Sequence, residues 1–152
     1  PASEPETQAM IALARRERFV AAVSFHSGTV AALTPYTIDG VKNPLPNEAW
    51  TVAEEIVRKL PVHPQGKPFR VRRKLYSVEG TDQDWLRHEL GTLAYILESA
   101  RHSPIGAAER NRLVAAVRPF WELLLDRFLD APEHLLQARR FETLRFAQVA
   151  VA

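Results

Sequence analysis

The chain has 152 residues, 46% hydrophobic and 25% charged, which is the balance of one globular domain with a real core. A formal net charge of +2 is too small to indicate a nucleic-acid partner, and no apolar run approaches the about 20 residues of a membrane span. The absence of cysteine excludes disulfides and thiolate chemistry.

Helical spacing and extended apolar segments alternate along the chain. The pattern predicts helices at residues 4–17, 48–60, 82–90 and 107–130, and extended segments at 18–25, 30–36, 69–78 and 91–98. The tail, residues 141–152, alternates weakly and has the pattern of a further strand. This order favours an α/β fold of three layers, with a mixed, mostly parallel sheet flanked by helices.

Polar residues mark the starts of the predicted helices. The expected caps are Ser3 with Glu6, Asn47, and Thr81 with Asp84. Pro119 lies inside the segment 107–130, where its missing N–H is expected to kink or split the helix.

Two polar residues end apolar strands. His26 ends FVAAVSFH and Glu98 ends LAYILE. Chemistry in open α/β sheets gathers beyond the carboxyl ends of strands. A glutamate there can serve as general base and a histidine as metal ligand. A structural role stays open for both, because a strand-end histidine can be satisfied by the protein and a strand-end glutamate can be solvated.

Further charged residues are interpreted as solvent-facing. The cluster RVRRK, at residues 70–74, alternates as the outer face of a strand does. The remaining histidines fall in predicted loops or on polar helix faces and are expected to be solvated: His63, His88, His102 and His134.

Three motifs stand in order at fixed spacings. FHSGTVAALTPY places Ser27 after His26 and the pair Pro35–Tyr36 nine residues after the histidine. YSVEGTDQDW fits Y-x-x-x-G-x-x-x-D-W from Tyr76, and Glu98 lies 22 residues after that tyrosine. In these motifs the chain resembles, over residues 2–131, the zinc metallocarboxypeptidases of the pancreatic carboxypeptidase A type.

The resemblance implies a role for each matching residue. His26 would be a zinc ligand through its neutral imidazole, and Glu98 the catalytic base that deprotonates the zinc-bound water and passes the proton to the leaving amine. Tyr76 would close over the substrate. Ser27 and Tyr36 would line the cleft, and Gln83 falls where the family has the residue that sets side-chain specificity. A neutral glutamine there favours apolar or polar C-terminal residues, whereas an acid would favour Lys or Arg.

One part of the family pattern does not occur in these residues. The family's first two zinc ligands come from a His-x-x-Glu motif, and no histidine here has a glutamate three positions later. Residues 1–131 therefore resemble the C-terminal half of the catalytic domain, and residues 132–152 an extension or the start of a following domain. One zinc ion would need two further ligands from a missing N-terminal half.

The resemblance implies a peptide or protein C-terminus as substrate, and the isolated chain is expected to bind zinc weakly and to cleave little. The alternative is a non-catalytic peptide-binding or interaction domain that keeps the cleft. We expect the chain to be soluble, and a location in the bacterial cytoplasm, in the periplasm or outside the cell fits equally well.

Overall fold

The computed structural model describes residues 2–130, which form four helices and four strands. In chain order they are α1 (Pro5–Glu17), β1 (Ala21–His26), β2 (Val30–Leu33), α2 (Glu48–Val57), β3 (Val71–Arg72), α3 (Asp82–Leu90), β4 (Leu93–Ser99) and α4 (Gly106–Asp130). The expected alternation is confirmed. The predicted extension at 132–152, with its strand-like segment and His134, lies outside the described residues.

The four strands form one mixed sheet in the order β1-β4-β2-β3. β4 is parallel to β1 and antiparallel to β2, while β2 and β3 are parallel. Two of the three pairings are therefore parallel, which confirms a mixed, mostly parallel sheet. β1, which ends in a histidine, and β4, which carries the strand-end glutamate, are direct neighbours although about 70 residues separate them in the chain.

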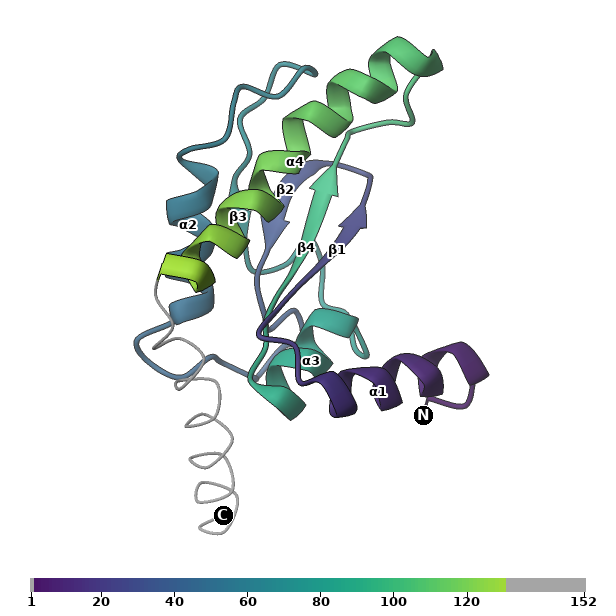
Figure 1. The fold of residues 1–152 in the computed structure, drawn as a ribbon, viewed down its shortest axis with the longest axis vertical. Helices are drawn as coiled ribbons and strands as arrows, with labels where there is room; N and C mark the ends of the chain where they lie inside the picture. The colour runs from purple at the N-terminus through teal and green to yellow at the C-terminus, as the bar shows by residue number, and fades with distance from the viewer. Residues whose placement is uncertain (1, 131–152) are drawn as a thin grey trace, which may run out of the picture.

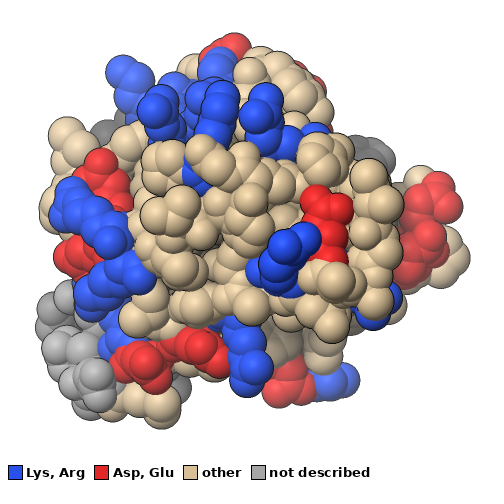
Figure 2. Space-filling model, turned by 90° about the horizontal axis from the view of Figure 1, so that it is seen from above, with Lys and Arg blue, Asp and Glu red and all other residues tan. Residues whose placement is uncertain are grey.

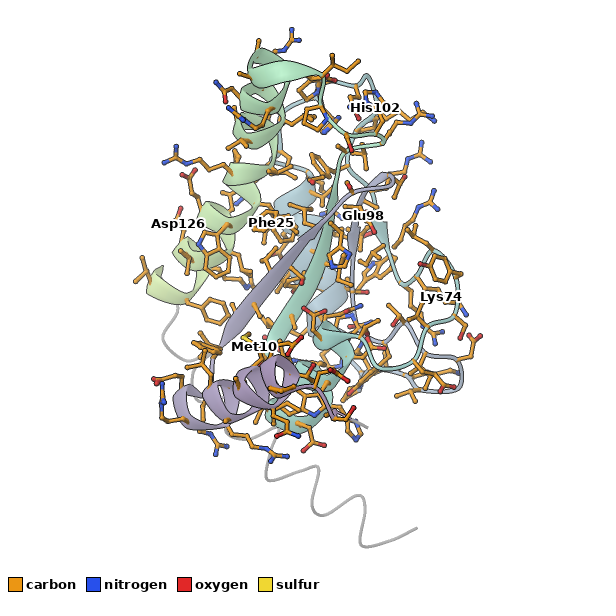
Figure 3. The ribbon with its side chains drawn as sticks, turned by 90° about the vertical axis from the view of Figure 1, so that its right-hand side faces the viewer. Met10, Phe25, Lys74, Glu98, His102 and Asp126 are labelled. Carbon is orange, nitrogen blue, oxygen red and sulfur yellow. The ribbon has the colours of Figure 1, made fainter. Side chains whose placement is uncertain are left out.

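The main core lies between the sheet and the helices α2 and α4, which cover one face (Figure 1). Alternation along β4 turns Leu93, Tyr95 and Leu97 into this core. The intervening residues face the other way, where Ile96 packs with Ala31 and Leu33. Figure 3 shows α4 on one side of the sheet and the labelled Glu98 and Lys74 on the other. α1 and α3 lie at the end where β1 and β4 begin (Figure 1).

One of the three predicted helix caps forms as expected. The Asn47 side chain accepts a hydrogen bond of 3.2 Å from the Trp50 N–H and starts α2. The Ser3–Glu6 box is wrong, because α1 begins at Pro5 with Glu4 as its cap residue and the Ser3 hydroxyl donates to Glu4 instead.

Thr81 is the cap residue of α3, but its side chain caps no backbone N–H. Its hydroxyl lies 3.2 Å from that of Thr37, and the Asp84 carboxylate accepts from the Thr37 N–H and hydroxyl. Both expected capping groups are therefore used in a tertiary contact with the loop after β2.

Pro119 does not split the last helix, since α4 is continuous from Gly106 to Asp130. Leu113, Phe120 and Leu124 are buried on its inner face, and this packing holds the helix together on both sides of the proline. Among the described residues, no helix is both long and apolar enough to cross a membrane.

Tyr95 joins the sheet to both covering helices. Its ring is fully buried and packs edge-on against Phe120, with 5.7 Å between ring centroids. Its hydroxyl donates to the Ala49 carbonyl at 3.1 Å, and burial raises the pKa of this phenol.

We expect Tyr95→Phe to lower the free energy of unfolding by about 1–2 kcal/mol, because the buried Ala49 carbonyl loses its side-chain donor. Urea denaturation followed by circular dichroism measures the change. Tyr76→Phe is the matched control, since that side chain is 71% exposed and its hydroxyl should contribute less than about 0.5 kcal/mol. Equal stability of the two variants would contradict the expectation.

Candidate active site

His26 and Glu98 lie side by side at the same end of the sheet. Their Cα atoms are partners in the parallel pairing of β1 and β4, so their side chains leave the sheet on the same face. That face is the one opposite α4, and Figure 3 shows Glu98 pointing to that side while Phe25 points to the α4 side. An imidazole and a carboxylate from separate parts of the chain therefore open toward one space.

The Glu98 carboxylate is buried and incompletely satisfied. The side chain is 7% exposed, and its Oε2 atom has no hydrogen-bond partner within residues 2–130. Buried polar atoms without a partner are rare in native proteins, and each needs an explanation such as a bound ion, water or ligand. The Oε2 atom can therefore accept a hydrogen bond from a molecule that residues 2–130 do not supply.

Gly28 lies against the same carboxylate. A Cβ atom added at this position would lie 3.7 Å from Glu98 Oε2, and the glycine has φ +147°, a conformation that side chains rarely adopt. Its N–H donates to the Ala100 carbonyl at 2.7 Å, which fixes the turn after β1. The turn thus brings backbone close to Glu98 without covering it with a side chain.

The His26 side chain is exposed, while its backbone is fixed. The strand pairing holds the main chain, and the His26 carbonyl accepts a hydrogen bond of 2.5 Å from the Ser99 hydroxyl. An imidazole that is exposed on a rigid strand end is available to a metal ion. Among the described residues, however, no group of three or more His, Cys, Asp or Glu side chains could hold a metal, so His26 would be one ligand of a set.

The other expected cleft residues differ in exposure. Ser27 is exposed next to His26, and Tyr76 is 71% exposed in the loop between β3 and α3. Tyr36 is 6% exposed, and its ring packs edge-on against His88 with centroids 6.1 Å apart. The Tyr36 ring is therefore held in the protein, whereas Ser27 and Tyr76 are accessible.

The tyrosine loop is the segment between β3 and α3 that carries Tyr76. Its first residues are bound to the loop after β2. The Arg73 guanidinium donates to the carbonyls of Tyr36, Ile38 and Val41 at 2.8–3.1 Å. Lys74 forms an ion pair with Asp39, and this hydrogen bond lowers the pKa of the Asp39 carboxyl. These contacts fix the end of the loop nearest the sheet, while Tyr76 itself stays exposed.

Gln83 is a second buried group without partners. Its side chain is 1% exposed in the first turn of α3, and neither its amide nitrogen nor its amide oxygen has a hydrogen-bond partner in the described structure. The neighbouring Asp84 carboxylate is instead fully engaged with Thr37 and the Ile38 N–H. Gln83 can therefore donate to or accept from a ligand side chain.

His63 overturns one expectation from the sequence. It is 1% exposed, not solvated, with its Nε2 2.9 Å from the Ser99 carbonyl and its Nδ1 accepting from the Gln65 N–H at 3.1 Å. The Ser99 carbonyl lies 36 residues away in the chain, so no local pattern in the sequence signals this burial. His88 and His102 are exposed, as expected.

A solved structure shows the same fold, and a family model gives the family. The fold resembles that of bovine thrombin-activatable fibrinolysis inhibitor, solved in complex with a tick carboxypeptidase inhibitor, with a TM-score of 0.55 and 21% sequence identity. The likeness covers 83% of this chain and 47% of that one, so the chain spans about half the length of that relative. No curated protein sequence matches the chain.

The family model described as zinc carboxypeptidase matches residues 1–108, and the chain belongs to this family. The family inferred from the three sequence motifs is thereby confirmed. The matched residues include His26 and Glu98, together with the tyrosine loop and Gln83.

Proposed function

We propose that this chain is the C-terminal half, residues 1–131, of the catalytic domain of a zinc-dependent metallocarboxypeptidase, which hydrolyses the C-terminal peptide bond of a peptide or protein. The observation that carries the proposal is the pairing of His26 with Glu98 on one face of the sheet, with Glu98 Oε2 buried and unpartnered. The likeness to a protein about twice as long supports the assignment to one half.

The residues present fit part of a catalytic zinc site. His26 offers an exposed imidazole on a rigid strand. Three protein ligands are usual for catalytic zinc, so two further ligands would come from the N-terminal half. Zinc, when bound, polarises the scissile carbonyl and acidifies water.

Glu98 is proposed as the general base. Its carboxylate accepts a proton from the attacking water and then delivers that proton to the leaving amine. Oε2 is buried beside Gly28, which keeps bulk water away from this oxygen.

The other residues hold the substrate. Tyr76, on its exposed loop, is proposed to close over the C-terminal residue, while Ser27 and Tyr36 line the cleft near the scissile bond. The Gln83 amide would contact the side chain of the residue that is released. A neutral amide there disfavours basic C-terminal residues, which need a carboxylate partner.

The partner half is proposed to dock on β1. In the described sheet β1 is an edge strand with a single neighbour, β4, so one side of its backbone is unpaired. Phe25 on this strand is 54% exposed, which is unusual for a large aromatic side chain. A strand from the N-terminal half would pair with this edge and bring its zinc ligands toward His26.

We expect the isolated 152-residue chain to bind zinc weakly, because one imidazole replaces little of the ion's hydration shell. Isothermal titration calorimetry should show no tight, stoichiometric site, and His26→Ala should abolish whatever weak heat is seen. A tight one-to-one zinc signal from this chain would contradict the incomplete ligand set. Loss of peptide hydrolysis in Glu98→Gln, made in the complete catalytic domain, tests the enzymatic proposal itself.

A further inference from the structure

The basic segment RVRRK is divided between two faces of the edge strand β3. Val71 packs against the main core on the α2 side. Because side chains alternate along a strand, Arg70 and Arg72 leave the sheet on the opposite face. Arg73 and Lys74, which follow, are tied to the loop after β2. The sequence-based interpretation of one solvent-facing set therefore holds only in part.

The strand register places the two exposed arginines in line with the candidate active site. Arg72 is paired with Leu33 and Leu33 with Ile96, while Ala31 is paired with Glu98. The same register puts Arg70 beside Ala31, and the Arg70 carbonyl accepts from the Ala32 N–H at 2.9 Å. Arg70 thus lies in the row of Glu98 on the same face, two strand spacings or roughly 10 Å away.

Neither guanidinium is neutralised by the part of the chain that the structure describes. Both side chains are exposed, and within residues 2–130 neither has an ion pair or a side-chain hydrogen bond. By contrast, Arg73, Lys74 and Arg87 each have partners. Figure 2 shows Lys and Arg side chains gathered along one margin of the surface seen from above. Arg70 and Arg72 form a positive wall beside the candidate active site, because neither has an acidic partner in residues 2–130. Such a wall attracts an anionic group in the adjoining space.

The sheet surface between this wall and Glu98 is formed by a few apolar side chains. Ala31, Leu33 and Ile96 form a separate cluster on this face of the sheet, and all three are buried. Gln83, with its unpartnered amide, comes from α3, which packs against β4. A C-terminal side chain entering here would meet methyl groups along its stem and hydrogen-bond donors at its end.

We propose that Arg70 and Arg72 determine substrate specificity and select peptides with an acidic C-terminal residue, glutamate or aspartate; this rests on the proposed carboxypeptidase function. The guanidinium groups offer charge-assisted hydrogen bonds to the side-chain carboxylate of such a residue. This acidic preference replaces the preference for apolar or polar ends that Gln83 alone implies.

The test compares peptides that differ only in their last residue, Glu, Gln or Lys. The complete catalytic domain is assayed for hydrolysis, and binding of the same peptides, labelled with a fluorophore, is measured by anisotropy. We expect Glu to be preferred over Gln by roughly tenfold in both assays, because hydrogen bonds to charged groups are the stronger ones. Raising the ionic strength from about 0.05 to about 0.5 M should reduce the preference.

Variants separate the arginines from the general charge of the protein. Arg70→Gln with Arg72→Gln should remove the preference for Glu, and Arg70→Glu with Arg72→Glu should reverse it toward Lys. Arg110→Gln, an exposed arginine on α4 across the sheet, should change nothing. All these side chains are exposed, so circular dichroism should show an unchanged fold.

The outcomes distinguish the arginine proposal from the carboxypeptidase proposal. Hydrolysis without a preference for Glu, or a preference that survives both double variants, overturns the arginine proposal and leaves the carboxypeptidase intact. Binding with a preference that depends on the arginines, but without hydrolysis, supports the subsite and overturns the peptidase. Neither binding nor hydrolysis of any peptide overturns both.

Discussion

Glu98→Gln is expected to reduce the hydrolysis of C-terminal residues by the complete catalytic domain about a thousandfold or more. Glutamine keeps the shape of the side chain but cannot take a proton from water, and a positioned general base typically contributes 10²–10⁴-fold to a rate. The measurement is kcat/KM for a chromogenic peptide at saturating zinc. Loss in kcat with little change in KM would fit a group that acts on the reaction and not on substrate binding.

Glu98→Gln is also expected not to lower the stability of the fold, so misfolding would not explain its loss of activity. Glu98 Oε2 is buried without a partner, and a carboxylate in that situation is costly to the folded state. Replacing it with a neutral amide should leave the free energy of unfolding unchanged or raise it by about 1 kcal/mol. Glu122→Gln is the control, since it breaks an exposed ion pair with Arg118 that contributes little to stability and lies on α4.

The outcomes distinguish the two functions considered for this chain. Unchanged hydrolysis in Glu98→Gln refutes the assignment of the general base. A wild-type domain that binds peptides but hydrolyses none of them favours the alternative of a non-catalytic peptide-binding module. A variant that is inactive and also unfolds at lower denaturant would leave the loss of activity to misfolding and so contradict the buried-carboxylate argument.

The order of helices and strands follows from local patterns, and these were sufficient for the fold class. The apolar segment before Glu98 becomes β4, one of the two inner strands, and Asn47 starts α2 through its own side chain, because both depend on neighbours in the chain. The strand-end positions of His26 and Glu98 could be predicted for the same reason. Which face each side chain takes could not, because this depends on the register between strands, and a shift of one residue would turn His26 to the other face.

Two of the failures, at Asp84 and His63, share one physical origin, which is contact over long separations in sequence. Asp84 was expected to be the acidic partner of the Thr81 cap of α3, but its carboxylate accepts instead from the backbone N–H of Thr37, 47 residues away. His63 was expected to be solvated, but the Ser99 carbonyl needs a donor and His63 supplies it from 36 residues away. Local capping preferences are worth about 1 kcal/mol, so a buried tertiary partner readily replaces them.

Gln83→Asp is expected to shift the preference of the complete catalytic domain toward Lys and Arg ends by about 10- to 100-fold. The substitution places a carboxylate where the wild-type amide has no partner, and a hydrogen bond to a charged group contributes about 1.5–3 kcal/mol. Asp84 cannot take over this role in the wild type, because its carboxylate is occupied by Thr37 and Ile38. The measurement is the ratio of kcat/KM for peptides that end in Lys and in Gln.

Gln83→Leu separates specificity from stability at the same position. It has a similar volume and removes both unpartnered amide atoms, so the free energy of unfolding should rise by about 1 kcal/mol while apolar C-terminal residues become preferred. Gln83→Asp should instead lower the stability of the free protein, because the new carboxylate is buried without a cation until a basic substrate binds. If Gln83 lines the side-chain pocket, Gln83→Leu should raise the stability and favour apolar ends, and Gln83→Asp should lower the stability and favour basic ends. If both variants keep the wild-type preference while folded, Gln83 does not contact the substrate and its orphaned amide serves some other purpose.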